Sequence, residues 1–312
     1  MKSNKDHVEL SINNLAFYWS FPEIVAIEEG YYQDEGIIVN VNDVTPKTKV
    51  TSKNKMYENL QRKGLSNMYH AAEWVSIFRA AESEFSRIVA WSPWNTDALT
   101  SSFTIYAKNN SVITEPKLLQ DKVIAVENGT GSYFTTIEDL EKYIPREKIK
   151  FKMMGDPHER LQAVLSDQVN AASLLGVYID IAEHLKLTKI FESKRKKGTL
   201  MVTANEVSTD TLKKFIRGTN KAINSINKYP NKYQPKYFER FDIILRKIGK
   251  DIPISSKELR NTLRVPRWSL WQEYPKERFN DAYTWMTERN LVNGRYTYND
   301  LVNNRAFSDS GD

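Results

Sequence analysis

A turn between an apolar run and a helical pattern carries residue types that can hold an anion or a hydrogen-bonding group. The stretch NGTGS (128–132) follows the apolar run 122–126, and a helical pattern over 132–143 comes next. The first amide groups of a helix lack partners within the helix, so this turn offers N–H donors to a ligand. It has neither the ending of a P-loop nor the spacing of the dinucleotide fingerprint. We predict ligand contacts from Thr130, Gly131, Ser132 and Tyr133, the alternative being a tight turn in which Ser132 caps the helix.

Aromatic residues gather just before the first predicted helix. In FYWSFPE (17–23), Tyr18 and Trp19 lie in a loop that precedes a proline-initiated helix. Such rings are usually core residues, but several in one loop are hard to bury together. We predict that Tyr18 and Trp19 contact a ligand, with Trp19 stacking on its planar part. Glu23, in the first turn of the helix, is expected to be a surface acid that compensates the helix dipole.

A third candidate is MYHAAEW (68–74), which brings His70, Glu73 and Trp74 together. On a helix, His70 would share a face with Glu73 and Trp74 at spacings of three and four. We predict ligand contact from His70 and Trp74, and simple packing of this stretch stays open as the alternative. The other three histidines are far away in the sequence, so we predict no metal site.

Tyr178 follows the end of a predicted strand in SLLGVYID (173–180). Ligands of open α/β sheets bind outside the carboxyl ends of strands, so Tyr178 is also a predicted ligand contact. No serine lies in a nucleophile elbow, and no pair of acids has a spacing typical of acid–base catalysis. We therefore predict no catalytic residue and no cofactor.

These candidates lie at junctions of alternating strand and helix patterns. Alternation and turn residues predict strands at 8–12, 37–41, 86–91, 103–107, 122–126, 149–153, 169–174 and 200–204. Helical patterns cover 21–31, 55–63, 74–81, 132–143, 157–165 and 178–185, with longer ones at 209–229, 235–249 and 275–291. Such alternation is typical of an α/β fold with largely parallel sheets.

A second series of alternating strands and helices, beginning near residue 103, divides the chain into two lobes. We predict a discontinuous first lobe of residues 1–102 and 199–312, including the C-terminal helices, and an inserted second lobe of residues 103–198. The chain would cross between them near 101–107 and 198–205. Two such crossings predict a hinged pair of lobes with a ligand cleft between them.

Composition narrows the class of protein. The 312 residues include no cysteine, which excludes disulfides and thiolate metal sites. The net charge of +6 is spread thinly apart from the run KRKK at 194–197, and no nucleic-acid-binding motif accompanies it, so we predict no nucleic-acid partner. No apolar run is long enough for membrane insertion. The first residues lack an export signal, so we expect a cytoplasmic chain, or a periplasmic or extracellular one if a signal was removed.

Three stretches resemble one family. AFYWSFPEIVAIEEGYYQDEGIIVNV (16–41), DKVIAVENGTGSYFT (121–135) and MMGDPHERLQAVLSDQVNAASLLGVYIDIAE (153–183) resemble the SsuA/THI5-like (NMT1/THI5) family of type II periplasmic-binding proteins. The likeness covers roughly residues 8 to 205. It implies a two-lobed α/β fold with an interlobe cleft, a small-molecule ligand and an ABC permease as partner. Members bind sulfonates, nitrate or thiamine precursors.

One branch of that family is a thiamine-pyrimidine synthase, which consumes a histidine of its own and carries a lysine four residues before it. In the matching stretch, His70 stands where the lysine would be and Trp74 where the histidine would be. The branch's cysteine-rich motif is absent from a chain without cysteine. We therefore expect a binding protein for a planar, heteroaromatic or anionic ligand. The alternative is a cytoplasmic biosynthetic enzyme on the same fold.

Overall fold

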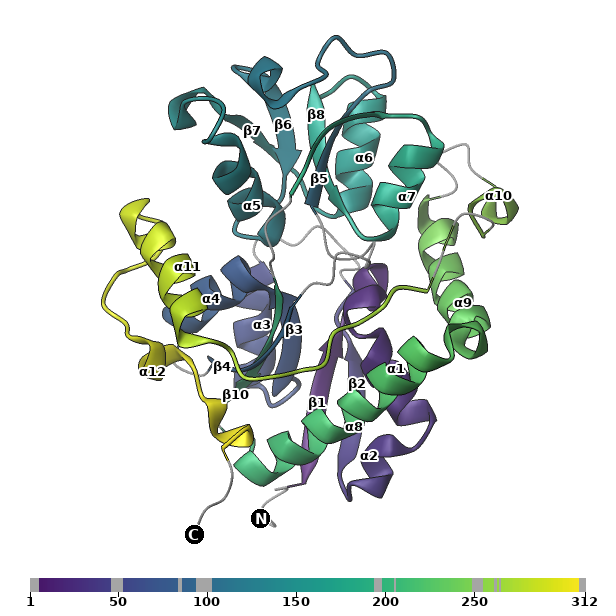
Figure 1. Ribbon diagram of the computed structural model, residues 1–312, viewed down its shortest axis with the longest axis vertical. Coiled ribbons are helices and arrows are strands. Elements are labelled where there is room, and N and C mark those ends of the chain that lie inside the picture. The colour runs from purple at the N-terminus through teal and green to yellow at the C-terminus, as the bar shows by residue number, and fades with distance from the viewer. Residues whose placement is uncertain are drawn as a thin grey trace. The chain divides into compact units, whose positions relative to one another are not determined.

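The computed structural model describes residues 6–45, 53–83, 86–93, 103–193, 198–204, 206–248, 255–260, 263 and 265–308. The run 194–197, residues 101–102 of the first predicted crossing and residue 205 of the second lie outside these residues. The chain forms two compact units. Unit 1 comprises residues 1–95, 197–232 and 267–312, and unit 2 comprises residues 96–196 and 233–266. Figure 1 labels most of the helices and strands of both.

Unit 1 is built on a five-stranded sheet in the order β2-β1-β3-β10-β4. Its strands are β1 (His7–Ile12), β2 (Ile38–Asp43), β3 (Met68–Ala72), β4 (Ser86–Pro93) and β10 (Gly198–Ala204). Strand β1 runs parallel to β2 and β3, while β10 runs antiparallel to both β3 and β4. The carboxyl ends of β1 to β4 therefore lie at one edge of the sheet, called here the unit 1 carboxyl edge.

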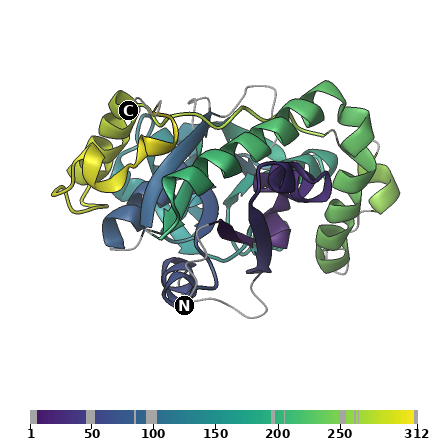
Figure 2. The ribbon, with the colours of Figure 1, turned by 90° about the horizontal axis from the view of Figure 1, so that it is seen from below.

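Helices pack around this sheet, and the residues between β1 and α1 form a short 3-10 helix. The elements are η1 (Asn14–Trp19), α1 (Phe21–Glu28), α2 (Tyr31–Asp34), α3 (Lys53–Arg62), α4 (Glu73–Glu82), α8 (Thr209–Lys228), α11 (Lys276–Glu288), α12 (Tyr298–Leu301) and η4 (Asn304–Ala306). Helix α8 lies along α1 and α2 (Figure 2). The contact is close because Gly218 has no side chain: a Cβ there would lie 2.6 Å from a ring carbon of Tyr32.

Unit 2 has its own five-stranded sheet in the order β7-β6-β8-β5-β9. The strands are β5 (Phe103–Ala107), β6 (Val123–Val126), β7 (Lys150–Met153), β8 (Ala171–Leu175) and β9 (Thr188–Glu192). Strand β6 is parallel to β7 and β8, and β5 is antiparallel to β8 and β9. All residues of β5 and β8 are buried, as expected for central strands covered on both faces.

The helices of unit 2 come from two parts of the chain. They are η2 (Pro116–Leu119), α5 (Gly131–Leu140), η3 (Arg146–Lys148), α6 (Pro157–Leu165), α7 (Val177–His184), α10 (Ser256–Arg260) and most of α9 (Pro230–Ile248). The apolar core of the unit includes Ile105, Ile124, Leu140 and Ala171. Helix α10 packs against α7, so residues 233–266 group with unit 2, whereas the sequence placed them in the first lobe.

The predicted alternation of strands and helices in two α/β units is confirmed. Two strands were missed, β3 and β9. Strand β3 was missed because MYHAA passes into α4 without a turn residue between them. His70 therefore lies in a strand, and the predicted helical face shared with Glu73 and Trp74 is wrong.

Candidate functional site

The loop after β1 and the end of β3 meet at the unit 1 carboxyl edge. Since β1 and β3 are parallel neighbours, the residues that follow them emerge on the same side of the sheet. Trp19 ends η1 and is half-buried. Its carbonyl oxygen lies 3.4 Å from Nδ1 of His70, and the hydroxyl of Ser20 lies 3.5 Å from the same nitrogen. The strand thus holds the aromatic loop through the imidazole ring.

Behind this contact lies a buried carboxyl group. Oε1 of Glu23 is 3.7 Å from Nε2 of His70, and each side chain is only 1% exposed. The indole Nε1–H of Trp271 donates to Oε1 of Glu23 at 3.3 Å. The rings of His70 and Trp271 lie 4.8 Å apart. The expectation that Glu23 is a surface acid is therefore wrong, because Trp271 and His70 cover it.

Burial sets the protonation of both groups. It raises the pKa of Glu23 to about 8, an effect that the hydrogen bonds from its own backbone and from Trp271 only partly oppose. It lowers the pKa of His70 to about 4, although the hydrogen bond to the Trp19 carbonyl works in the opposite direction. At neutral pH this is a carboxylic acid beside a neutral imidazole. The bond to Trp19 assigns the imidazole proton to Nδ1, which leaves Nε2 as an acceptor facing Glu23.

Two tryptophans that the sequence reading did not select support the loop. Trp268 donates its indole N–H to the carbonyl of Tyr18 at 3.1 Å and packs on Phe21 with ring centroids 5.6 Å apart. Trp271 contacts Glu23 and His70 as described above. The available signal was RWSLW (267–271), two tryptophans three residues apart in a segment without a clear helical or strand pattern.

The remaining unit 1 candidates lie in the core. Tyr18 is 1% exposed and Trp74 is 3% exposed. The Trp74 ring packs on Trp285 at 4.7 Å between centroids. The neighbouring Glu73 is also buried, and accepts hydrogen bonds from the hydroxyl of Tyr274 at 2.7 Å and from Arg278. Of the unit 1 candidates, Trp19 lies in the loop after β1 and the His70 ring contacts that loop. Tyr18 and Trp74 pack in the core behind it.

In unit 2 the NGTGS turn joins β6 to α5. Gly129 has a left-handed φ of 63°, the backbone conformation that makes glycine suitable at this point. Helix α5 begins at Gly131, with Thr130 at its N-cap position, and no side chain of the described residues caps its first turn. The Ser132 hydroxyl instead accepts a hydrogen bond from the amide of Glu127 at 3.0 Å. The alternative of Ser132 as helix cap is therefore wrong: Ser132 ties the turn together and leaves the first helical amides uncapped by side chains.

Tyr178 lies at the same edge of the unit 2 sheet as this turn. Strands β6 and β8 are parallel neighbours, so the turn after β6 and the start of α7 after β8 share the unit 2 carboxyl edge. Gly176 makes the junction with a φ of 58°. Tyr178 is fully buried, Ser132 is 1% exposed, and Thr130 and Tyr133 are half-buried. The structure thus brings the unit 2 candidates to one edge, with Thr130 and Tyr133 the more accessible.

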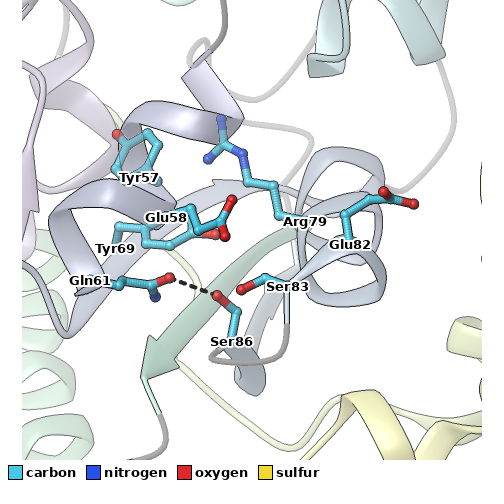
Figure 3. A pocket seen from close by; sticks show the side chains of 8 residues that line it. All are labelled: Tyr57, Glu58, Gln61, Tyr69, Arg79, Glu82, Ser83 and Ser86. Carbon is cyan, nitrogen blue, oxygen red and sulfur yellow. Dashed lines mark hydrogen bonds between the residues drawn. The ribbon is translucent and has the colours of Figure 1, made fainter.

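A small pocket lies elsewhere in unit 1, near the amino ends of β3 and β4. Its lining comes from α3, β3, α4 and the start of β4: Tyr57, Glu58, Gln61, Tyr69, Arg79, Glu82, Ser83 and Ser86 (Figure 3). The Arg79 guanidinium lies over the rings of Tyr57 and Tyr69, and Ser86 donates to Gln61 at 2.9 Å. The volume of about 30 Å³ suits one or two water molecules rather than an organic ligand.

Two features of the structure bear on metal binding and membrane insertion. Within the described ranges no three histidine, aspartate or glutamate side chains are grouped so that they could hold a metal ion. Among the helices that the structure describes, none is both long and apolar enough to cross a bilayer.

Comparisons with known proteins identify the fold. No protein-family model and no curated protein matches the chain. The alkanesulfonate-binding protein SsuA from Xanthomonas axonopodis pv. citri, solved with MOPS bound, superimposes with a TM-score of 0.73 at 12% identity, over 96% of this chain and 98% of that one. The periplasmic aliphatic sulphonate-binding protein SsuA from Escherichia coli gives a TM-score of 0.71 at 10% identity, over 95% and 92% of the two chains.

A eukaryotic protein is similar as well. A conserved Candida albicans gene product, described as exhibiting the generic periplasmic binding protein fold, gives a TM-score of 0.63 at 14% identity, over 98% of each chain. The chain therefore has the periplasmic-binding-protein fold along nearly its whole length. The fold that the sequence resemblance implied is confirmed.

Proposed function

We propose that this chain binds a small organic ligand as the receptor component of an ABC-type import system. The observation that carries the proposal is the pair of edges. In unit 1 the half-buried Trp19 is anchored through His70, and in unit 2 the NGTGS turn presents a helix start without a side-chain cap. Ligands of open α/β sheets bind at such edges. The fold shared with the sulfonate-binding proteins supports the same reading.

The two edges suit different parts of one ligand. The Trp19 ring offers a stacking surface for a planar or heteroaromatic group. The first amides of α5 suit an anionic or hydrogen-bond-accepting group. An ABC permease would then receive the loaded protein, which would act in the periplasm or outside the cell.

The test begins with a thermal-shift screen of aliphatic and aromatic sulfonates, carboxylates and pyrimidines. For a compound that raises the melting temperature, Trp19→Ala is expected to weaken binding by about 1–3 kcal/mol, the scale of one stacking contact. Trp19→Phe, the matched control, should retain most of the affinity because it keeps a ring. The measurement is calorimetric affinity beside melting without ligand. Normal affinity together with a much lower melting temperature would show that Trp19 is a core residue.

The turn in unit 2 provides a second test of the same ligand. Gly131→Val places a branched side chain at the first position of α5, where a ligand would approach the free amides. We expect a loss of affinity at least as large as that of Trp19→Ala, measured by the same calorimetry. Unchanged affinity in a variant that melts normally would remove the turn from the site.

The biosynthetic enzyme is less well supported. Trp74, which stands where the synthase carries its reactive histidine, is buried against Trp285. Incubation with pyridoxal phosphate and iron is therefore expected to give no pyrimidine product and no Schiff-base absorbance. A stoichiometric product with loss of a histidine from the protein would overturn the receptor proposal.

A further inference from the structure

Behind Trp19, the side chains of Trp271, Glu23 and His70 follow one another, and each has a donor that faces the next group. Trp271 can only donate, and it donates to Glu23. The His70 Nδ1–H faces the carbonyl of Trp19 at 3.4 Å, so Nε2 is the acceptor of the ring. Among the residues that the structure describes, this acceptor has no hydrogen-bond partner, and neither has Oε2 of Glu23, although both atoms are buried. Oε1 of Glu23 lies 3.7 Å from Nε2 of His70, just beyond hydrogen-bond distance, so this carboxyl group is the polar group that faces the acceptor.

Within the described part of the chain, no lysine or arginine forms an ion pair with Glu23. From β3 the neighbour is His70, and from segment 267–274 it is Trp271. From α2 it is the buried Tyr32, whose pKa burial raises first and the charge of Glu23 raises further. A carboxylate here would be a buried charge without a cation, the most costly state for such a group.

The charged residues of the adjoining helix α8 are engaged elsewhere. Arg217 and Lys221 both bind Glu35 at the end of α2, at 2.8 and 2.7 Å. Directly after α1, Glu29 pairs with Lys232 at 2.7 Å. Because these cations are paired with other acids, Glu23 is most simply neutralised by carrying its own proton.

We propose that Glu23 is a positioning residue for the Trp19 loop: as a carboxylic acid it donates its proton to Nε2 of His70, and His70 in turn holds the Trp19 carbonyl. The chain of hydrogen bonds is Trp271 to Glu23, Glu23 to His70, and His70 to Trp19. Loss of the proton in alkaline solution removes the middle donor and loosens the loop. The consequence for ligand binding, weaker stacking at alkaline pH, rests on the function proposed above.

The test uses the full chain without any ligand, so failure of this proposal and failure of the proposed function can be distinguished. The indole Nε1–H signals of the seven tryptophans are followed by ¹H–¹⁵N NMR from pH 5.5 to 9.5. Trp271→Phe and Trp19→Phe assign the two signals of interest. We expect the Trp271 and Trp19 signals to shift together with one midpoint, and Glu23→Gln to abolish both shifts because its amide keeps the donor at every pH.

Two further variants separate positioning from general packing. His70→Asn breaks the link to Trp19, so the Trp271 signal should still titrate whereas the Trp19 signal should not. Glu28→Gln, which removes an exposed acid from the same helix, should leave both titrations as in the parent. The proposal is overturned if the Trp271 signal is flat over this range, if it titrates unchanged in Glu23→Gln, or if the Trp19 signal does not follow it in the parent.

Discussion

Glu23→Gln is expected to be more stable than the parent protein at pH 8, with an advantage that grows as the pH rises from 6.5 to 8. Burial raises the pKa of Glu23 from 4.5 to about 8, so unfolding releases its proton between these values. The stability that the proton contributes is complete below pH 4.5 and is lost as the pH rises toward 8. Glutamine has the same shape, keeps an oxygen for Trp271 and does not ionise.

The ionisation of His70 limits the pH range in which the stability of the parent protein reports the ionisation of Glu23. Burial lowers its pKa from 6.5 to about 4, so unfolding takes up a proton in that range and stability falls as the pH falls. The two effects have opposite slopes between pH 4.5 and 6.5 and offset each other there. Above pH 6.5 the ionisation of Glu23 is the contribution that differs between the parent and Glu23→Gln, at about 1.4 kcal/mol per pH unit for one proton, or about 2 kcal/mol up to pH 8.

Urea unfolding at several pH values measures this difference. Glu28→Gln, the control on the exposed face of α1, should follow the parent at every pH. Parallel curves for the parent and Glu23→Gln from pH 6.5 to 8 would mean that Glu23 is ionised in the folded protein.

Glu73→Ala is expected to destabilise unit 1 by about 3–5 kcal/mol, the cost typical of removing one partner from a buried ion pair. Its carboxylate accepts from Tyr274 and Arg278, and it lies at the first position of α4, where a negative charge is favoured. Truncation leaves a buried tyrosine hydroxyl and a partly buried guanidinium without this acceptor.

Glu73→Gln is the matched variant, because it keeps the shape and an acceptor for Tyr274 while removing the charge. We expect an intermediate loss. Denaturant unfolding measures both variants, and a loss below about 1 kcal/mol for Glu73→Ala would show that Tyr274 and Arg278 find other partners.

Helices and strands with a regular repeat of apolar residues could be predicted from the sequence. Contacts between segments far apart in the chain could not. Strand β5 and helix α6 were placed at the residues the structure shows, because apolar runs and a proline at the helix start are local signals. Strand β3 was missed because its apolar letters continue into α4 without a turn residue.

The environment of Glu23 shows the limit for the site. Its place in the first helical turn predicted a surface acid, and that place is correct. Its burial depends on Trp271, 248 residues further along the chain, and no local pattern indicates that contact. For NGTGS the turn and the helix start were visible in the sequence, whereas the use of the Ser132 hydroxyl within the turn depends on side-chain geometry.

Hydrogen exchange with and without a bound compound tests the ligand-binding proposal most directly. The parent protein is saturated with a compound from the thermal-shift screen, and amide exchange is read by mass spectrometry in peptides covering 13–21 and 127–134. Peptides from β2 and α12 serve as internal references. We predict slower exchange in both site peptides, because the ligand contacts the Trp19 loop and the first amides of α5. If the compound raises the melting temperature but the exchange rates of both site peptides stay unchanged, the account is contradicted.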